Sequence, residues 1–222
     1  MHDVRKISVM EGILDENNHI AAHINESLSR NGILCVNVMG APGAGKTTAL
    51  KNIIRHMGKL TPYIIEGDIE SDIDTREFKK LGVKAWQINT FGACHLDAPM
   101  VHNTAGNIEF DEKGILFIEN IGNLVCPAEF GIGEHIKMLI SSVAEGSDKA
   151  YKYPLAFEKA DIIILSKTDL IPYVDFDEEF FMKGIRALNK DVKVFRTSDR
   201  SGESFKEAAG WLAERAGKIG RN

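Results

Sequence analysis

The stretch that decides the fold is GAPGAGKT at residues 40–47, which matches the pattern G-x-x-x-x-G-K-[ST] in full. It follows an apolar run at residues 33–39, which is typical of a parallel strand covered on both faces. It leads into a helical pattern at residues 47–57. Glycines let backbone N–H groups turn inward around a phosphate chain, and the start of a helix adds its positive end. Strand, loop and helix in this order predict a phosphate-binding loop.

Two side chains of this loop have distinct expected roles. The Lys46 ammonium should reach the β- and γ-phosphates of a nucleotide, which makes it a predicted catalytic residue. The Thr47 hydroxyl should ligate Mg²⁺. The other residues supply backbone groups to the phosphates. The predicted nucleotide-binding residues here are Gly40, Ala41, Pro42, Gly43, Ala44, Gly45, Lys46, Thr47 and Thr48.

Apolar runs and helical patterns alternate along the rest of the chain. This alternation is typical of βαβ crossovers and predicts an α/β fold of the P-loop NTPase kind, three layers α/β/α with a mostly parallel sheet. Ligands of such sheets sit at the carboxyl ends of the strands. We expect a single domain over residues 1–222, with a short helix at about residues 15–31 before the phosphate loop. The other expected strands are 63–65, 84–88, 115–118, 136–141, 162–165 and 192–195, and the other expected helices are 74–81, 154–160, 177–188 and 204–216.

Acidic residues follow two of the expected strands and could complete a Mg²⁺ site. Glu119 opens the segment ENIG, which has the spacing of a D-x-x-G switch with Glu in place of Asp. Asp68, Asp72 and Asp74 could hold Mg²⁺ directly, hold it through water, or orient an attacking water. Some of the three could instead cap the helix that begins near residue 74. The resulting prediction is Thr47, Asp68 and Glu119 as Mg²⁺ ligands, with Asp72 and Asp74 as catalytic residues.

Two short motifs favour guanine as the base. Residues 166–169 read Ser-Lys-Thr-Asp after a strand, where GTPases usually carry Asn-Lys-x-Asp. Asp169 could accept two hydrogen bonds from guanine N1 and N2, a pairing that adenine cannot offer, and the Lys167 stem could pack on the base plane. Ser198 follows the next strand, where a serine backbone N–H often meets guanine O6. Ser166 departs from the usual Asn, which leaves open what holds this loop.

A possible metal site lies in two segments that follow strands. Cys94, His95 and Cys126 offer thiolate and imidazole ligands, which suit Zn²⁺ or Ni²⁺. Taken alone they leave a second interpretation open, that of buried thiols, since no C-x-x-C pair is present. Three ligands do not close a tetrahedral site, so a fourth would come from water, a second chain or a transfer partner. His102, eight residues after Cys94, is a further candidate ligand.

The remaining cysteine and two other histidines are interpreted as structural. Cys35 lies within an apolar strand and is expected in the core. His19 and His23 are four residues apart, so they share a helix face and could in principle grip a metal. With no acidic third ligand on that face, a solvated helix is the preferred interpretation.

Composition excludes several other classes of protein. The chain has 27 Lys plus Arg against 32 Asp plus Glu, a net charge of −5, and no basic run, which argues against a nucleic-acid partner. Three cysteines do not make a disulfide scaffold. No apolar run is long enough to span a bilayer, and no leader is visible, so we expect a cytoplasmic protein without a membrane partner.

The whole pattern resembles the HypB-type hydrogenase nickel-incorporation GTPases, which belong to the SIMIBI class. The resemblance runs from about residue 33 to about residue 212 and rests on the phosphate loop, on EGDIESD at 66–72, and on SKTDLIPYVDF at 166–176. The segments CHLDA at 94–98 and ENIGNLVCP at 119–127 are specific to that family.

The resemblance implies a Mg²⁺-dependent GTPase that helps deliver nickel to the large subunit of [NiFe] hydrogenase. It implies a GTP-favoured homodimer with a Zn²⁺ or Ni²⁺ site built from Cys94, His95 and Cys126. The implied partners are GTP and GDP, a HypA-type nickel chaperone and the hydrogenase large subunit precursor. Some members carry an N-terminal C-x-x-C-G-C motif or a His-rich stretch. This sequence has neither before its phosphate loop, so we expect no separate N-terminal nickel site and no storage role.

One mechanistic hypothesis follows from spacing. Only six residues separate Glu119 from Cys126, so loss of the γ-phosphate could move a thiolate at the far end of the same segment. Slow hydrolysis is expected, because no arginine finger or catalytic Gln is evident. Three rivals stay open: a urease-accessory-type nickel GTPase, a small-molecule kinase with the same phosphate loop, and a metal chaperone with vestigial nucleotide binding.

Overall fold

The sheet of the computed structural model confirms the predicted fold class. The structure describes residues 4–68, 73–90, 92–200 and 202–220. Within these ranges one parallel seven-stranded sheet has the order β3-β2-β4-β1-β5-β6-β7. The strands are β1 (Ile33–Met39), β2 (Thr61–Asp68), β3 (Lys84–Asn89), β4 (Gly114–Glu119), β5 (Ile136–Ser142), β6 (Ile162–Ser166) and β7 (Lys193–Arg196).

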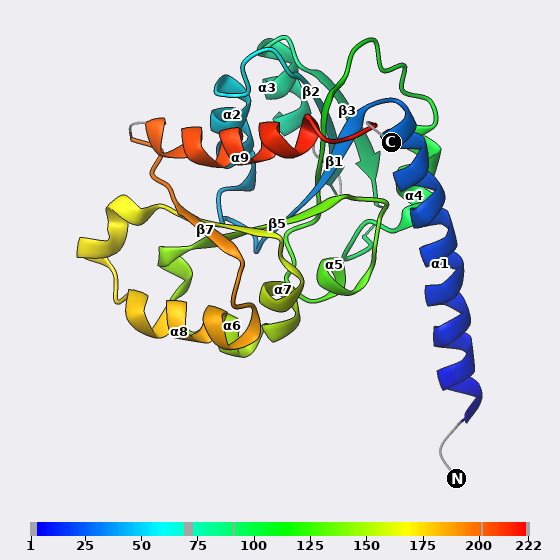
Figure 1. The fold of residues 1–222 in the computed structure, drawn as a ribbon. Helices are drawn as coiled ribbons and strands as arrows, with labels where there is room; N and C mark the ends of the chain where they lie inside the picture. The colour runs from blue at the N-terminus through cyan, green and yellow to red at the C-terminus, as the bar shows by residue number, and fades with distance from the viewer. Residues whose placement is uncertain (1–3, 69–72, 91, 201, 221–222) are drawn as a thin grey trace.

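Helices cover both faces of the sheet (Figure 1). Short 3-10 helices join some of the elements; they are η1 (Val143–Glu145), η2 (Thr168–Tyr173) and η3 (Glu203–Phe205). The α-helices are α1 (Val4–Arg30), α2 (Lys46–Arg55), α3 (Ile73–Lys80), α4 (Ala98–Ala105), α5 (Cys126–Glu129), α6 (Lys149–Lys152), α7 (Pro154–Lys159), α8 (Glu178–Leu188) and α9 (Lys206–Ala216).

The predicted start of the first helix was wrong, and the prediction left out α4, α5 and α6. The first helix begins at Val4 rather than near residue 15, and its N-terminal half extends beyond the other elements in Figure 1. The sequence-based start rested on the apolar face that meets the core, and no proline ends the helix upstream of that face. Helix α4 was not predicted, although Asp97 caps it by accepting a hydrogen bond from the Met100 N–H (2.8 Å) and Pro99 stands in its first turn.

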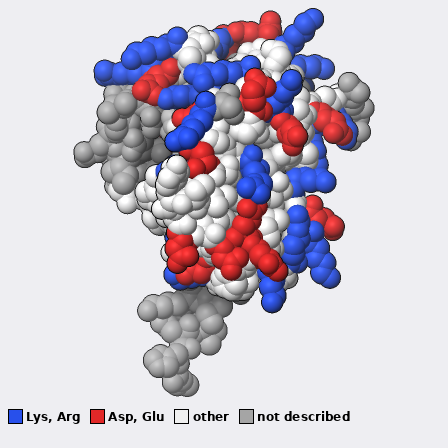
Figure 2. Space-filling view, turned by 90° about the vertical axis from the view of Figure 1, so that its left-hand side faces the viewer, with Lys and Arg blue, Asp and Glu red and all other residues white. Residues whose placement is uncertain are grey.

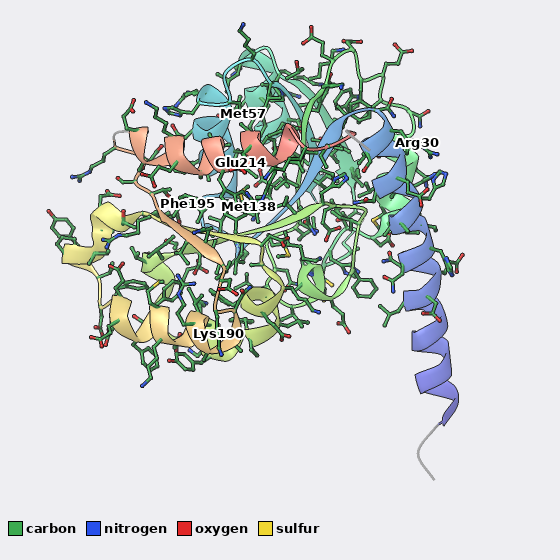
Figure 3. The ribbon with its side chains drawn as sticks, viewed as in Figure 1. Arg30, Met57, Met138, Lys190, Phe195 and Glu214 are labelled. Atoms are coloured by element: carbon green, nitrogen blue, oxygen red, sulfur yellow. The ribbon has the colours of Figure 1, made fainter. Side chains whose placement is uncertain are left out.

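The core lies on both faces of the sheet, as the alternation of β1 requires. Leu34, Val36 and Val38 face the layer formed by α2, α3 and α9. Ile33 and Cys35 face the opposite layer, where α1 and α4 cover one half and α5 to α8 cover the other. Methionines of the first layer, such as Met57 and Met138 in Figure 3, are buried between helix and sheet. The expectation that Cys35 belongs to the core is confirmed, and burial raises the pKa of its thiol.

The surface carries both signs of charge. On the face drawn in Figure 2, Lys and Arg side chains alternate with Asp and Glu, and neither sign forms a continuous cover. Elsewhere in the described residues opposite charges form local pairs, such as Lys152 with Asp148 (2.5 Å) and Arg196 with Glu178 (2.8 Å). None of the described helices combines the length and apolar character needed to cross a membrane.

A partly buried histidine joins α1 to the central strand. The Cys35 backbone N–H donates to His135 Nδ1 (2.9 Å), and His135 Nε2 lies 2.9 Å from the Ser29 hydroxyl. A backbone N–H can only donate, so Nδ1 must be unprotonated and Nε2 must carry the ring proton. Burial lowers the pKa of His135, and the neighbouring Glu134 carboxylate opposes that shift. The neutral imidazole is therefore part of the packed structure.

We predict that this histidine makes the fold acid-sensitive. The pKa is lower in the folded state, so protonation favours the unfolded chain, and stability should fall as pH drops from about 6.5 towards the folded pKa. The slope should reach at most about 1.4 kcal/mol per pH unit in urea unfolding. His135→Gln should lower the free energy of unfolding by about 1–2 kcal/mol and flatten this slope, whereas His56→Gln should keep it. An equal slope in the His135 variant would contradict the prediction.

Candidate nucleotide and metal site

The phosphate loop has the conformation that its glycines were expected to provide. Gly43 and Gly45 adopt left-handed backbone conformations, with φ of 76° and 96°. Gly45 directly precedes α2, so the first N–H groups of that helix open onto the loop. The Lys46 side chain is buried, and its Nζ donates to the Gly40 carbonyl (3.3 Å). The loop is thus folded around the place that a phosphate chain would take.

Two oxygen groups converge beside the loop. The Thr47 hydroxyl donates to Glu119 Oε1 (3.0 Å), and the Glu119 carboxylate is buried at the carboxyl end of β4. Hydroxyl and carboxylate oxygens are the ligands that Mg²⁺ prefers, so Thr47 and Glu119 fit the predicted magnesium site. Asp72 lies outside the described residues, as do the side chains of Asp68 and Asp74, and their roles stay predictions.

Ser166 performs the task that its departure from Asn had left open. Its hydroxyl donates to the Ala44 carbonyl of the phosphate loop (2.6 Å) and lies 3.5 Å from the Ser141 carbonyl oxygen. The residue is buried at the end of β6. A serine hydroxyl therefore ties the loop after β6, which is predicted to bind the base, to the phosphate loop.

Two of the predicted base-binding residues, Lys167 and Asp169, line one small cavity. It has a volume of about 190 Å³ and lies between the start of α2 and the loop after β6, with Thr48, Lys167 and Asp169 on its wall. Lys167 has a left-handed backbone with φ of 57°, and its Nζ donates to the Gly43 carbonyl (2.7 Å). Its side chain therefore crosses from the base loop to the phosphate loop, as a lysine packed along a base would.

Asp169 is already engaged by two side chains. The Ser198 hydroxyl donates to its Oδ1 (2.9 Å), and Arg200 Nε lies 3.3 Å from its Oδ2. The Ser198 backbone N–H donates to the Ser204 hydroxyl (2.9 Å). The structure thus brings Ser198 to Asp169. A base that bound to the Asp169 carboxylate or to the Ser198 backbone N–H would replace these contacts with its own hydrogen bonds.

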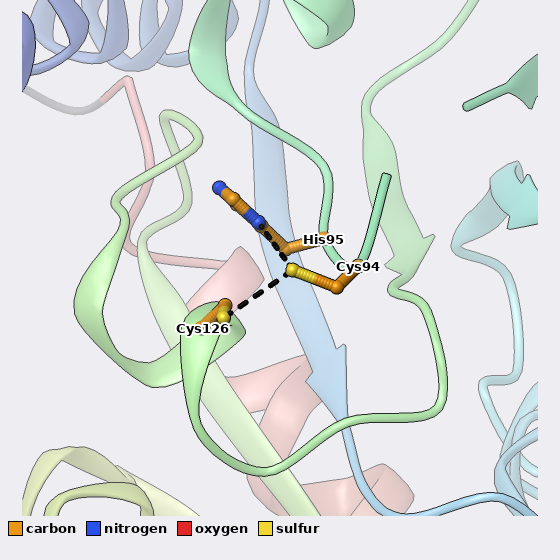
Figure 4. A group of neighbouring side chains, drawn as sticks. All are labelled: Cys94, His95 and Cys126. Carbon is orange, nitrogen blue, oxygen red and sulfur yellow. Dashed lines mark hydrogen bonds between the residues drawn. The ribbon is translucent and has the colours of Figure 1, made fainter. Parts of the chain in front are cut away.

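Cys94, His95 and Cys126 form a compact group (Figure 4). The Cys94 sulfur lies 3.4 Å from the Cys126 sulfur and 3.4 Å from His95 Nδ1. In a tetrahedral zinc site, bonds of about 2.3 Å to sulfur and 2.0 Å to nitrogen set these separations at about 3.8 and 3.5 Å. The donor set and its spacing therefore fit one soft or borderline cation. The hydrogen bond between the thiols, and then burial, raise the pKa of Cys126.

Neighbouring side chains hold this group in place. Asn123 Nδ2 donates to the Cys94 carbonyl (3.2 Å), and its Oδ1 accepts from the Val125 N–H (2.9 Å) just before Cys126. The His95 ring packs on Phe130, with ring centroids 4.4 Å apart. One asparagine thus joins the two ligand segments.

The end of β4 serves both halves of the site because successive residues of a strand point to opposite faces. Glu119 points towards Thr47 of the phosphate loop. Asn120 points the other way: its Oδ1 accepts from the Leu96 N–H (3.0 Å), and its Nδ2 donates to Asn37 Oδ1 (3.2 Å). Asn120 is almost fully buried. The loop that carries Cys94 is therefore anchored one residue away from the predicted magnesium ligand.

The segment between Glu119 and Cys126 also rests on the phosphate loop. Gly40 and Asn123 form an antiparallel bridge. A Cβ atom at Gly122 would come within 2.8 Å of the Pro42 ring, so a side chain there would separate the two loops. On the other side, a Cβ at Gly67 would lie 2.9 Å from the side chain of Leu96, which is fully buried. Close packing at these two glycines therefore holds the loop that carries Cys94, the segment from Glu119 to Cys126 and the phosphate loop against their neighbours.

Sequence reasoning missed Asn120, Asn123 and the role of Ser166. The two asparagines stood inside the quoted ENIGNLVCP segment without a role of their own. The signal that could have found Asn120 is the alternation of side chains along a strand. Because Asn120 follows the predicted Mg²⁺ ligand Glu119 at a strand end, its side chain must point to the opposite face of the sheet. His102 is not part of the metal group formed by described residues; it lies on α4 beside His23.

The chain is similar to known proteins. Residues 34–196 match the family model described as CobW/HypB/UreG, nucleotide-binding domain. The hydrogenase maturation factor HypB of Azotobacter chroococcum is 42% identical over 96% of this chain and 70% of its own length. The hydrogenase/urease maturation factor HypB of Helicobacter hepaticus is 33% identical over 95% of this chain and 88% of its own.

A solved structure supports the same relation. The crystal structure of HypB from Helicobacter pylori in complex with nickel superposes with a TM-score of 0.84 at 32% identity. The match covers 91% of this chain and 96% of that one. The likeness therefore extends to nearly the whole fold.

We predict that Ser166→Ala loosens the phosphate loop. Loss of this buried hydrogen bond leaves the Ala44 carbonyl unsatisfied and should lower the free energy of unfolding by about 1–2 kcal/mol. Nucleoside diphosphate affinity, measured by titration calorimetry, should fall several-fold. Ser147→Ala, at a surface serine that accepts from Asp177 N, is the matched control and should leave that affinity unchanged. Equal affinities for the wild type and the Ser166 variant would refute the role assigned to this hydroxyl.

Proposed function

This chain belongs to the HypB family of hydrogenase maturation factors, and on that premise we propose that it hydrolyses GTP to help insert nickel into the large subunit of [NiFe] hydrogenase. One observation carries the proposal. The segment from Glu119 to Cys126 touches the phosphate loop at one end and supplies a metal ligand at the other. A protein that only hydrolysed nucleotide, or only held a metal, would need no such segment.

Guanine selection rests on the cavity beside Lys167 and Asp169. A carboxylate in that position complements the N1 and N2 donors of guanine and repels the N1 acceptor of adenine. Ser198 already orients Asp169 through its hydroxyl. GTP is therefore the proposed substrate, which disfavours the small-molecule kinase alternative because that enzyme would need an adenine site.

Hydrolysis would depend on groups of the chain that surround the phosphates. Bound Mg²⁺, held by Thr47 and Glu119, would neutralise charge that develops on the phosphate oxygens. Lys46 would bind the β- and γ-phosphates, for which it would exchange its contact with the Gly40 carbonyl. Asp68, Asp72 and Asp74 remain the proposed source of a further Mg²⁺ contact and of the group that orients water. A slow intrinsic rate remains part of the proposal, because the sequence shows no evident arginine finger or catalytic Gln.

The nickel ion would be cargo rather than a resident cofactor. Cys94, His95 and Cys126 offer three ligands, with Cys94 exposed, so a fourth position stays open to water or to a partner. The proposed partners are a HypA-type nickel chaperone, the large subunit precursor and a second copy of this chain, and the proposed location is the cytoplasm. The same site would accept Zn²⁺. The segment CHLDA at residues 94–98, which is typical of the HypB-type family, favours this role over that of a urease-accessory GTPase.

The base proposal is tested by Asp169→Asn. An amide offers one donor and one acceptor, so guanine binding should weaken at least about a hundredfold while binding of a xanthine nucleotide is gained. Competition assays with GDP, ADP and xanthosine diphosphate measure this exchange. Asp199→Asn, a neighbouring carboxylate on the same cavity, is the matched control and should keep the guanine preference. Tighter binding of ADP than of GDP by the wild type would sink the proposal.

The coupling between nucleotide and metal is tested at Asn120. We expect nickel affinity of the wild type to differ at least about fivefold between GDP and a non-hydrolysable GTP analogue. Asn120→Ala should remove most of that difference, because the metal loop loses its anchor at the strand end. Asn120→Asp keeps the two acceptor contacts but loses the donation to Asn37, so it should give an intermediate result.

Two controls complete this experiment. Asn107→Ala, on the surface, should behave as the wild type, and Cys126→Ala should weaken nickel binding in both nucleotide states. A competing metal indicator reports the affinities. A wild type whose nickel affinity ignores the nucleotide would refute the coupling, yet it would leave GTP hydrolysis and the metal site standing.

A further inference from the structure

His19, His23 and His102 line one hollow of the surface, and none of the three belongs to the Cys94 group. His19 and His23 lie on α1, four residues apart, and His102 lies on α4. The rings of His23 and His102 have centroids 5.7 Å apart and an interplanar angle of 51°. The sequence had predicted a solvated face for the α1 pair because it lacked a third ligand. The fold supplies that ligand from another helix.

The two helices that carry these histidines are firmly joined. The Ala98 N–H at the start of α4 donates to Asn17 Oδ1 of α1 (2.9 Å), and this hydrogen bond is buried. Ile24 and Val101 pack in the same core cluster. His102 stands one helical turn after Ala98, so it lies on the face of α4 that meets α1. The spacing between the backbones of the histidines is therefore fixed by packing, while their side chains remain exposed.

The histidines stand between two hollows of the surface. One hollow of about 340 Å³ is lined by His19, His23 and His102 together. A second hollow of about 450 Å³ shares His23 and His102 as its wall. No hydrogen bond to another described residue occupies the ring nitrogens of these three side chains. The imidazoles therefore have room to turn and lone pairs to offer.

We propose that His19, His23 and His102 form a second site for a divalent transition-metal ion. Two imidazoles on one ion, with bonds of about 2.1 Å, place their ring centroids about 5 to 6.5 Å apart, and the observed 5.7 Å falls in that range. Neutral imidazole favours Ni²⁺, Cu²⁺ and Zn²⁺ over Mg²⁺. Histidines in an i, i+4 pair supply two ligands from one helix face, and α4 supplies the third.

This site would hold its ion more loosely than the cysteine group does. It has no thiolate, its three ligands are exposed, and water would fill the remaining positions. An ion there could exchange with solvent or with an incoming carrier. The site is independent of the proposed GTPase cycle, because none of its residues contacts the phosphate loop, the base cavity or the Cys94 group among the described residues.

The test uses the full chain with Cys94→Ser and Cys126→Ser as background, which removes the thiolates. Titration calorimetry with NiCl₂ alone should still detect one bound ion. Nuclear magnetic resonance spectra of the histidine rings should show the signals of His19, His23 and His102 broadened together. Thiolate-to-nickel absorption bands should be absent, which separates this ion from one at the cysteine group.

Single substitutions then assign the site. His23→Gln and His102→Gln should each weaken the remaining nickel binding at least about tenfold, since even outer-shell changes cost about ten- to a hundredfold. His56→Gln and His2→Gln, at other histidines, should leave it unchanged. Circular dichroism checks that each exposed variant stays folded. A background protein that binds no nickel, or equal losses in the control variants, would overturn the proposal.

Discussion

The end of β4 is the constraint on which the site depends. Two consecutive side chains leave this buried strand on opposite faces, so Glu119 reaches the phosphate loop while Asn120 holds the loop that carries Cys94. A strand end packed on both sides cannot rotate freely, because rotation would break the parallel pairing with β1 and β2. The position of the metal group therefore depends on the position of Glu119 beside the phosphate loop, because Glu119 and Asn120 are adjacent residues and β4 is paired with both of its neighbouring strands. No long chain of contacts is needed. The rest of the fold supplies the walls that keep this strand end rigid.

Much of the fold followed from local patterns of sequence. The apolar run at 33–39 became β1 with the predicted bounds, and the GAPGAGKT loop took the left-handed glycine conformations that its composition indicated. What could not be predicted was the pairing of residues distant in the chain. Ser166 fills the role of an asparagine only because β6 ends beside Ala44, and this neighbourhood is a property of the strand order. Likewise, His102 joined His23 rather than Cys94, because α4 docks on α1.

The candidate site divides in the same way. Cys94, His95 and Cys126 could be identified as ligand types from sequence, and the fold brings their donor atoms within 4.8 Å of one another. The residues that hold them, Asn120 and Asn123, carried no chemical signature, since buried asparagines that satisfy backbone groups look like any polar residue in a loop. The chemical type of the side chains thus identified the candidate metal ligands from the sequence. Only the three-dimensional structure identified the asparagines that hold those ligands in place.

Gly67 has a consequence for how such a protein can diverge. A side chain at this position would press on Leu96, which is fully buried and has nowhere to move except outward with the loop that carries Cys94. One substitution next to Asp68, outside the Cys94 group and outside the phosphate loop, would therefore displace the metal group. Cys94, His95 and Cys126 could thus all be present in a variant whose metal group is displaced.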